Sequence, residues 1–468
     1  MEAQFLSERG AVSGAPRKRT TKTLVSTTTV GNVLEWYDWA IYSSAAALIL
    51  NELFFPTLTP ASGVLASLAT FAVGLIARPV GGLILGHLGD KHGRRPVLVA
   101  TLLVMGIATT LIGCLPTYDT IGIAAPILLV VLRLAQGFGA GAEYAGATSM
   151  VVEDAPPSRR GFFASLTIVG VVGGIALASA VTAAMASLPR EHLISWGWRV
   201  PFLLSIVLVV VGIVVRMKVP ESKAYEKVKQ SHQVARLPLG ELLRQQPGRV
   251  ITAMIANAPL AFNIYVIQVF GLSYVTGRGV AKNIPLVGLL LGCIAGMILA
   301  PIAGALADRY GRRRTYVGFC LFNGIFAGPF FLLLSTGSTV SIWAAMALGF
   351  GLGCVTINAI SASLLPEIFS ARYRFTGVVF SREMSLVLLA APAPLVAALL
   401  TNSAGGNPWP VAVLMTFFAF AAAVAVLRLP ETRGTDLIQT DLIQTEHVEV
   451  ERSEGERIEA ERRGSRVD

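Results

Sequence analysis

The sequence predicts an all-α membrane protein in which twelve transmembrane helices form two pseudo-symmetric bundles of six. Of its 468 residues, 54% are hydrophobic and only 14% are charged, whereas a soluble domain has a charged share of about 25%. The apolar residues come in blocks of about twenty, the length at which a helix crosses a bilayer. Several features of the first half also return, in the same order, in the second half.

The clearest repeat is a basic segment, GHLGDKHGRR from Gly86, which returns 218 residues later as GALADRYGRR from Gly304. Gly permits a tight turn, Asp can accept hydrogen bonds at a helix end, and paired Arg cannot enter hydrocarbon. We therefore expect two short turns at the membrane surface that act in conformational switching, against the alternative of basic loops that only fix orientation. Their residues are Gly86, Asp90, Gly93, Arg94, Arg95, Asp308, Gly311, Arg312 and Arg313.

Two further features recur at nearly the same offset. Glu153 is echoed by Glu367, and the Pro-Glu-Ser of 220–222 is echoed by the Pro-Glu-Thr of 430–432. Three features that recur in the same order indicate that the second half of the chain is a repeat of the first half.

The apolar blocks define the expected spans and the division of the chain. Spans are expected at about 27–54, 62–86, 96–115, 121–149, 162–187, 199–217, 249–276, 284–306, 315–335, 338–363, 376–400 and 409–428. The corresponding parts are an N-terminal segment 1–26, a bundle 27–217, a linker 218–248, a bundle 249–428 and a tail 429–468. A short helix is expected in the linker near Leu239–Gln246.

Charge in the loops predicts the orientation. The basic residues concentrate in the N-terminus and alternate loops, while the six opposite loops hold only Arg190, Arg278 and Lys282, with Arg199 at a boundary. Because Lys and Arg favour the cytoplasmic side, both termini are expected to be cytoplasmic in a multi-pass protein of the inner or plasma membrane. The net charge of +10 thus reflects loops and tails and predicts no nucleic-acid partner.

No feature of the sequence predicts catalysis or a cofactor. The four cysteines (Cys114, Cys293, Cys320 and Cys354) lie in or beside apolar runs, without the spacing of metal ligands, so we expect buried thiols and no metal. No nucleophile–base set or phosphate loop is present. We expect a non-enzymatic monomer whose partners are the bilayer, a small molecule and protons.

Polar residues in the first span predict proton chemistry. Glu35, Asp38 and Tyr42 share one helical face, and an ionisable group inside a membrane requires a function or a partner. Two carboxylates this close cannot both ionise cheaply in a low dielectric, so one is expected to hold a proton near neutral pH. Asp38 is the expected proton-coupling residue, supported by Glu35, for which an interfacial helix start is an equal alternative.

The fourth span carries a second polar stripe: Arg133, Gln136, Glu143 and Tyr144. Arg133, Gln136 and Tyr144 are expected to bind the substrate, together with Tyr42 of the first span. Arg133 cannot be neutralised and needs an anion, which is either a substrate carboxylate or Asp38 in a structural salt bridge. Glu143 is a supporting carboxylate for the proton. Gly137, Gly139 and Gly141 are expected to thin this helix for close packing.

The second half contributes amides instead of charges: Asn257, Asn263, Gln268 and Asn358. These are expected to orient a substrate, with interhelical hydrogen bonding as the alternative. Arg78 is expected to extend toward the cytoplasmic surface, with lining of the transport pathway as the alternative, and Arg382-Glu383 is expected to be a self-compensating pair.

The doubled Gly-x-x-x-Asp-x-x-Gly-Arg-Arg loop resembles that of the major facilitator superfamily. Within it, Glu35-Trp36-Tyr37-Asp38, Arg78-Pro79, Arg133-x-x-Gln136-Gly137 and Trp196-Gly197-Trp198-Arg199 resemble the metabolite:proton symporter branch, over nearly the whole length to about Arg433. The resemblance implies two six-helix bundles that rock around a central site and proton-driven uptake of metabolites such as citrate, 2-oxoglutarate, shikimate, proline or betaine. Ala142, where the branch usually has a second glycine, and the Arg382-Glu383 pair depart from it.

The combined expectation is a proton symporter that imports a small polar metabolite, an organic acid such as a dicarboxylate, tricarboxylate or shikimate-like acid. The alternatives are uptake of a zwitterionic osmolyte, export of drugs or solutes, and an osmosensor built on the tail. Export is disfavoured because exporters of the fold that the chain resembles commonly have a Gly-Pro pair in span five, whereas the glycines of span five here have no adjoining Pro.

Overall fold

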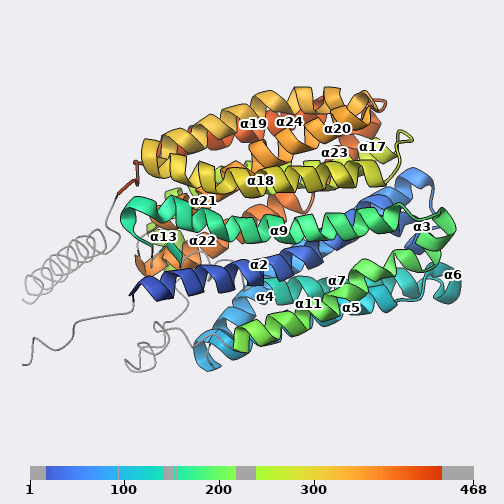
Figure 1. Ribbon diagram of the computed structural model, residues 1–468, viewed down its shortest axis with the longest axis horizontal. Helices are drawn as coiled ribbons and strands as arrows, with labels where there is room; N and C mark the ends of the chain where they lie inside the picture. Colours follow the sequence, from blue (N-terminus) through green and yellow to red (C-terminus); the bar gives the residue numbers. More distant parts are fainter. Residues whose placement is uncertain are drawn as a thin grey trace, which may run out of the picture.

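A computed structural model of the chain describes residues 17–92, 94–141, 151–152, 155–217, 239–369 and 371–434. Within these ranges the chain is helical and has no β-strand. The long helices run roughly parallel in an elongated bundle (Figure 1). The end at which α11 finishes at Met217 and α13 begins at Leu239 is called the linker end.

The N-terminal bundle contains α2 to α11. Its elements are α2 Arg17–Leu48, α3 Leu50–Phe54, α4 Pro60–His92, α5 Arg94–Cys114, α6 Tyr118–Ile121, α7 Ala124–Ala140, the 3-10 turn η2 Pro157–Arg159, α9 Arg160–Ala186, α10 Arg190–His192, the π-helix η3 Leu193–Gly197 and α11 Arg199–Met217.

The C-terminal bundle contains α13 to α24. Its elements are α13 Leu239–Gln245, α14 Pro247–Ala256, α15 Ala258–Ala261, α16 Asn263–Tyr265, the π-helix η4 Val266–Phe270, α17 Gly271–Thr276, α18 Asn283–Tyr310, α19 Arg312–Ser335, α20 Thr339–Met346, the π-helix η5 Ala347–Val355, α21 Thr356–Ile368, α22 Ala371–Ser385, the π-helix η6 Leu386–Ala390, α23 Ala393–Ser403 and α24 Trp409–Leu427. The short helix expected in the linker is confirmed as α13.

Nine helices of the described ranges are long and apolar enough to cross a membrane, and two shorter apolar helices, Val99–Cys114 and Ala124–Ala140, lie at predicted spans three and four. The remaining predicted span is α2, which carries Glu35 and Asp38. From Leu34 to Leu48 its side chains are buried inside the protein, so these polar groups face protein and not lipid.

The repeated basic segment forms a tighter turn than predicted. In the second copy α18 continues to Tyr310 and α19 begins at Arg312, so that Gly311 alone makes the turn, with φ +102°. Only Gly adopts this backbone readily. In the first copy α4 continues to His92 and α5 begins at Arg94. Gly86 lies within α4, whereas Gly93 and the side chains of Asp90, Arg94 and Arg95 lie outside the described part.

The two bundles meet along α9 and α18, which run side by side (Figure 1). At the linker end the two backbones approach so closely that a Cβ on Gly161 would lie 2.6 Å from Gly304 O, and a Cβ on Gly304 would lie 2.4 Å from Gly161 O. At the opposite end Lys282, just before α18, forms an ion pair of 3.1 Å with Glu52 of α3. The bundles are therefore in contact at both ends.

Candidate functional site

Glycines bring α4 and α7 close enough to bury two arginines between the helices. A Cβ on Gly137 would lie 2.0 Å from Gly74 O, and one on Gly141 would lie 2.0 Å from Arg78 O. The prediction that glycines thin this helix is confirmed. Arg133 of α7 is 0% exposed and Arg78 of α4 is 2% exposed.

Arg133 is held by an amide, a backbone carbonyl and aromatic rings. Its Nη1 donates to Gln136 Oε1 and its Nη2 donates to Phe71 O at 3.4 Å. Its Cζ lies 4.2 Å from the ring centroid of Trp39, 3.9 Å from that of Tyr42 and 5.3 Å from that of Phe71, where the π-faces attract a cation.

Within the described ranges no carboxylate forms an ion pair with Arg133, and its Nε has no hydrogen-bond partner. The salt bridge to Asp38 that the sequence left open is not formed in this conformation. A buried guanidinium without a counter-ion is energetically costly, so this position is suited to receive an anion.

Asp38 instead faces α11 and α5. Its Oδ1 accepts a hydrogen bond of 2.5 Å from Ser205 Oγ, and Thr109 of α5 also lies within hydrogen-bonding reach of the carboxylate. Gln136 Nε2 donates to Thr109 Oγ1 at 2.9 Å and to the Asp38 carbonyl oxygen at 3.3 Å. Gln136 therefore connects the Arg133 guanidinium to the backbone of Asp38.

Glu35 and Arg78 belong to a separate ion network that crosses between the bundles. Arg78 Nη2 lies 3.3 Å from Glu35 Oε1, and Arg78 Nε lies 3.1 Å from Glu383 Oε2 of α22. Arg382 Nη1 lies 3.6 Å from Glu383 Oε1. The expectation that Arg78 extends to the surface is wrong, because two buried carboxylates hold it inside. The self-compensating pair expected of Arg382-Glu383 is only part of a larger network.

The amides of the C-terminal bundle occupy three different settings. Asn257 and Asn358 line a small cavity together with Ser361 and Arg382, and the buried Asn257 Nδ2 has no hydrogen-bond partner within the described part of the chain. Gln268 Nε2 donates to Ser43 Oγ of α2 at 3.3 Å, across the interface.

Asn263 Nδ2 donates to Asn323 Oδ1 at 2.5 Å and to Met415 O at 3.2 Å. These contacts fit the interhelical role that the sequence left as the alternative. Tyr42 Oη donates to Thr70 Oγ1 at 2.7 Å. Glu143 and Tyr144 lie outside the described part of the chain.

The second basic turn joins the bundles at the linker end. Asp308 Oδ1 and Oδ2 accept hydrogen bonds of 2.9 Å from the backbone N–H groups of Gly161 and Phe162, at the start of α9. Arg312 Nη1 lies 2.6 Å from Asp308 Oδ1, and Arg312 Nε lies 3.4 Å from Glu367 Oε2. A carboxylate on free N–H groups at a helix start is a favourable electrostatic contact.

The same turn is held by the segment after α24. Glu431 accepts from the backbone N–H of Arg312 at 2.8 Å and of Arg313 at 3.2 Å, and Arg313 Nη1 donates to Leu429 O at 3.2 Å. Two motifs that repeat between the halves thus meet at one place.

No group of three or more metal-ligating side chains occurs in the part of the chain that the structure describes. Cys293, Cys320 and Cys354 are buried as expected, whereas Cys114, at the end of α5, is exposed.

Comparison with known proteins identifies the family. The Major Facilitator Superfamily model matches residues 28–391. The chain belongs to the Major Facilitator Superfamily. It is therefore a member of a family of membrane transporters, which are not enzymes.

Relatives cover nearly the whole chain. It is 36% identical over 415 residues to the inner membrane metabolite transport protein YhjE of Escherichia coli K12, covering 87% of this chain and 94% of that protein. It is 36% identical over 409 residues to the shikimate transporter of the same organism, covering 86% and 93%. It is 31% identical over 425 residues to the proline/betaine transporter of that strain, covering 88% and 84%.

Solved structures agree on the fold. The xylose transporter XylE of E. coli, in a partially occluded inward-open conformation, superposes with a TM-score of 0.69 at 18% identity, covering 89% of this chain and 99% of that one. This chain has the major facilitator fold.

Several residues of the candidate site were not identified from the sequence. Trp39, Phe71 and Ser205 are ordinary residues of apolar runs, and no local pattern sets them apart. Arg78 and Glu383 were both noticed, but they are 305 positions apart and their pairing depends on how the two bundles meet.

Proposed function

We propose that this transporter is a proton symporter that imports a small carboxylate metabolite across the inner or plasma membrane by alternating access, with both termini cytoplasmic. The observation that carries the proposal is the pairing state of two buried groups. Among the described residues, Arg133 has no carboxylate partner, and Asp38 is bonded only to neutral groups. Asp38 precedes Trp39, one of the aromatic rings that surround the Arg133 guanidinium, directly in the sequence of α2.

The substrate carboxylate is assigned to Arg133. A guanidinium binds a carboxylate through two parallel N–H donors, and Nη2 has only a long bond of 3.4 Å to a backbone carbonyl in this conformation. Binding of the anion would remove the cost of an unneutralised buried cation.

The aromatic surroundings of Arg133 favour an acid over a betaine. A quaternary ammonium is typically recognised inside an aromatic cage, but Trp39, Tyr42 and Phe71 already surround the Arg133 guanidinium. The cage is therefore occupied by the protein's own cation. The cavity of Asn257, Asn358 and Ser361 offers neutral donors and acceptors to the rest of the substrate.

Asp38 is assigned the transported proton. Glu35 is neutralised by Arg78 at 3.3 Å, whereas among the described residues Asp38 has no cation within ion-pair distance. An uncompensated carboxylate at 3% exposure is disfavoured as an anion. Gln136 touches both sites, so binding at one can alter the other, which is the requirement for symport.

The names of the relatives support a small polar metabolite. Those related proteins include a shikimate transporter and an inner membrane metabolite transport protein. The shared fold supports two bundles that rock about a central site.

The proposal is tested by uptake into proteoliposomes of a labelled panel: a dicarboxylate, a tricarboxylate, a shikimate-like hydroxy acid and betaine, each with and without an inward proton gradient. An acid should accumulate only with the gradient. Asp38→Asn should abolish accumulation yet keep exchange of labelled for unlabelled substrate, because it resembles the protonated carrier. Accumulation of betaine alone, or accumulation by Asp38→Asn, would contradict the proposal.

A further inference from the structure

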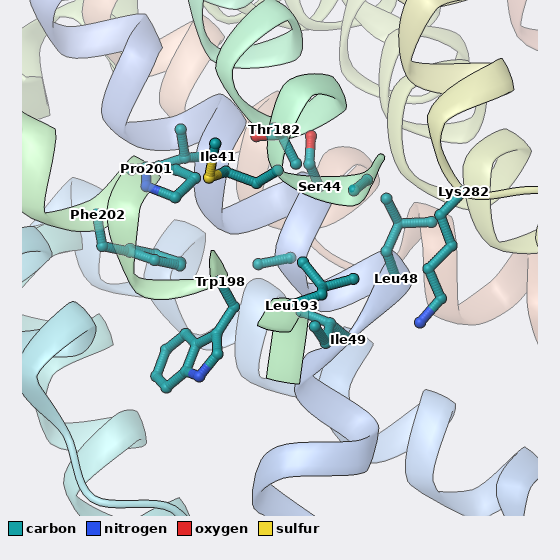
Figure 2. Close-up of a pocket in the computed structure, with 13 residues that line it drawn as sticks. Ile41, Ser44, Leu48, Ile49, Thr182, Leu193, Trp198, Pro201, Phe202 and Lys282 are labelled. Carbon is teal, nitrogen blue, oxygen red and sulfur yellow. The ribbon is translucent and has the colours of Figure 1, made fainter. Parts of the chain in front are cut away.

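A small cavity lies inside the N-terminal bundle, near the end opposite the linker (Figure 2). It is lined mainly by α2, α9 and α11, with Ile41, Ser44, Thr182 and Phe202 in its wall, together with Trp198 just before α11 and Lys282 of the C-terminal bundle at its edge. Its volume, counted as the space open to the centre of a water molecule, is about 30 Å³. One water requires roughly 10–15 Å³ on that basis, so the cavity has room for water.

Three buried polar atoms in its wall lack a hydrogen-bond partner among the residues that the structure describes. They are Ser44 Oγ, Thr182 Oγ1 and Trp198 Nε1, and all three residues line this one cavity. Ser44 is 0% exposed and Trp198 is 3% exposed. Buried donors and acceptors of native proteins are almost always bonded, to ordered water where no protein group is available. The three atoms would hold a short water cluster.

The cavity lies one helical turn from the Asp38–Ser205 hydrogen bond. Ile41 follows Asp38 by three residues on α2, and Phe202 precedes Ser205 by three residues on α11. Three residues of helix rise roughly 5 Å, and one or two waters span such a distance. Tyr37 Oη donates to Pro201 O at 2.8 Å, which fixes α2 against α11 at the wall of the cavity.

The other end of the cavity reaches the contact that closes the bundles. Lys282, from the C-terminal bundle, lies at its edge (Figure 2) and is paired with Glu52 at 3.1 Å. Glu52 is also 2.9 Å from Arg190, whose side chain is 75% exposed. The cavity thus lies between this polar, partly exposed cluster and Asp38, and all its lining residues except Lys282 belong to the N-terminal bundle.

We propose that this cavity is a water-filled proton pathway from the end opposite the linker to Asp38, and that it persists while the bundles are closed to substrate. This proposal of a proton pathway rests on the proposed function, because it requires Asp38 to be the residue that binds the transported proton. A hydronium ion of the external water gives its proton to the first bonded water. Each water then releases one proton to the next, so that one O–H bond breaks as another forms, and the last proton binds an oxygen of the Asp38 carboxylate.

Apart from Lys282 at its edge, the lining residues of the cavity belong to the N-terminal bundle, so the path does not require separation of the two bundles. Among the described residues, the ionisable groups that act on Asp38 are Glu35 and Tyr37 of its own helix, while α5 and α11 present the hydroxyls of Thr109 and Ser205.

The first test asks whether the cavity contains water. Ser44→Cys is made in a Cys114→Ser background, which removes the one exposed thiol among the native cysteines. The silver ion, a charged thiol reagent of about the size of a water molecule, should modify it. The matched control is Ser381→Cys, because Ser381 is also a fully buried hydroxyl without a partner but lies in α22, outside the cavity. Equal, slow reaction of both variants would overturn the proposal.

The second test asks whether the water carries the proton. Thr182→Val removes one hydroxyl at constant volume and should slow proton-driven accumulation about fivefold, the effect of one lost hydrogen bond, while exchange of labelled for unlabelled substrate keeps its rate. Thr401→Val is the control, since Thr401 Oγ1 is likewise buried without a partner, in α23. Equal loss of accumulation and exchange, or no loss in Thr182→Val, would overturn the pathway.

Asp38→Asn separates the two proposals. If that variant still accumulates substrate, the proposed function fails at Asp38, and the pathway fails with it. If Asp38→Asn loses accumulation while Ser44→Cys is unreactive and Thr182→Val is normal, only the pathway fails.

Discussion

The Arg78 guanidinium contacts both carboxylate oxygens of Glu383 across the interface between the bundles, with Nε–Oε2 at 3.1 Å and Nη2–Oε1 at 3.4 Å. Arg78 is 2% exposed, and the side chain of Glu383 is 6% exposed. Rocking of the bundles would change the distance between the helices that carry these residues. This pair is therefore a point at which conformational change and buried charge are coupled.

Loss of Arg78 should destabilise the protein strongly. Arg78→Gln leaves the carboxylates of Glu35 and Glu383 without their shared cation, and removing one member of a buried pair costs about 3–5 kcal/mol. Glu383→Gln should cost less, because Glu35 still neutralises Arg78. The measurement is thermal unfolding in detergent.

The control for this prediction is Arg190→Gln, which removes a pair to Glu52 whose arginine side chain is 75% exposed. Exposed pairs contribute about 0–1 kcal/mol. Arg78→Gln and Arg190→Gln with the same melting temperature would show that the buried network does not stabilise the fold.

Gly74 leaves the space that Arg133 fills. A Cβ at this position would lie 2.5 Å from Arg133 Nε and 2.8 Å from its Cζ, so Gly74→Ala should displace the guanidinium from its cage. Charged hydrogen bonds contribute about 1.5–3 kcal/mol, and we expect substrate affinity to fall about 10- to 100-fold by equilibrium binding.

Gly173→Ala is the matched control on α9. Its Cβ would have ordinary contacts, 3.5 Å to Val33 Cγ2 and 4.0 Å to Met297 Sδ, and affinity should not change. A Gly74→Ala protein that binds substrate normally would show that the position of Arg133 in this conformation is not needed for binding.

The fold was predictable because its signals are local. Blocks of apolar residues mark the spans, and the doubled basic turn marks the two halves. The tightness of the Gly311 turn could not be foreseen, since helical continuation through Asp308 to Tyr310 depends on contacts with α9 and with Glu431.

The centre was predictable only in part. Glu35, Asp38 and Arg133 stand out because charge inside an apolar run is costly. Their partners depend on tertiary packing: Asp38 faces Ser205 and not Arg133, and Arg78 pairs with Glu383. Hydroxyls and aromatic rings do not stand out within apolar runs, so Ser205 and Trp39 gave no signal.

Asp308 should control the closed state at the linker end. Its two carboxylate oxygens bind the N–H groups of Gly161 and Phe162, and Asp308→Asn keeps one acceptor oxygen but loses the charge. We expect slower transport with substrate affinity within a few-fold, because the change acts far from Arg133. Turnover and equilibrium binding are measured separately.

Asp119→Asn, on the exposed helix α6 at the other end, is the control for Asp308→Asn and should transport normally. A large loss of affinity with normal turnover in Asp308→Asn would argue against a role in switching. Because Asp90 is the counterpart of Asp308 in the sequence repeat, Asp90→Asn is also expected to slow transport and to keep substrate affinity within a few-fold.

Arg133 should determine the charge of the substrate. Arg133→Lys keeps a cation but loses the planar pair of donors and the stacking against Trp39 and Tyr42, which lie 4.2 Å and 3.9 Å from its Cζ. A carboxylate bound through two parallel N–H groups should therefore bind at least about tenfold more weakly to the Lys variant.

Arg133→Gln removes the charge altogether and should abolish binding of an acid, while proton conduction through Asp38 need not be lost. Equilibrium binding of a labelled acid at several ionic strengths is the measurement, since an anion held in a buried site is little screened by salt. If Arg133→Gln binds and transports normally, Arg133 is a packing residue within its aromatic cage. The substrate anion would then have to bind elsewhere, and Arg382, beside the cavity of Asn257 and Asn358, would be the position to test next.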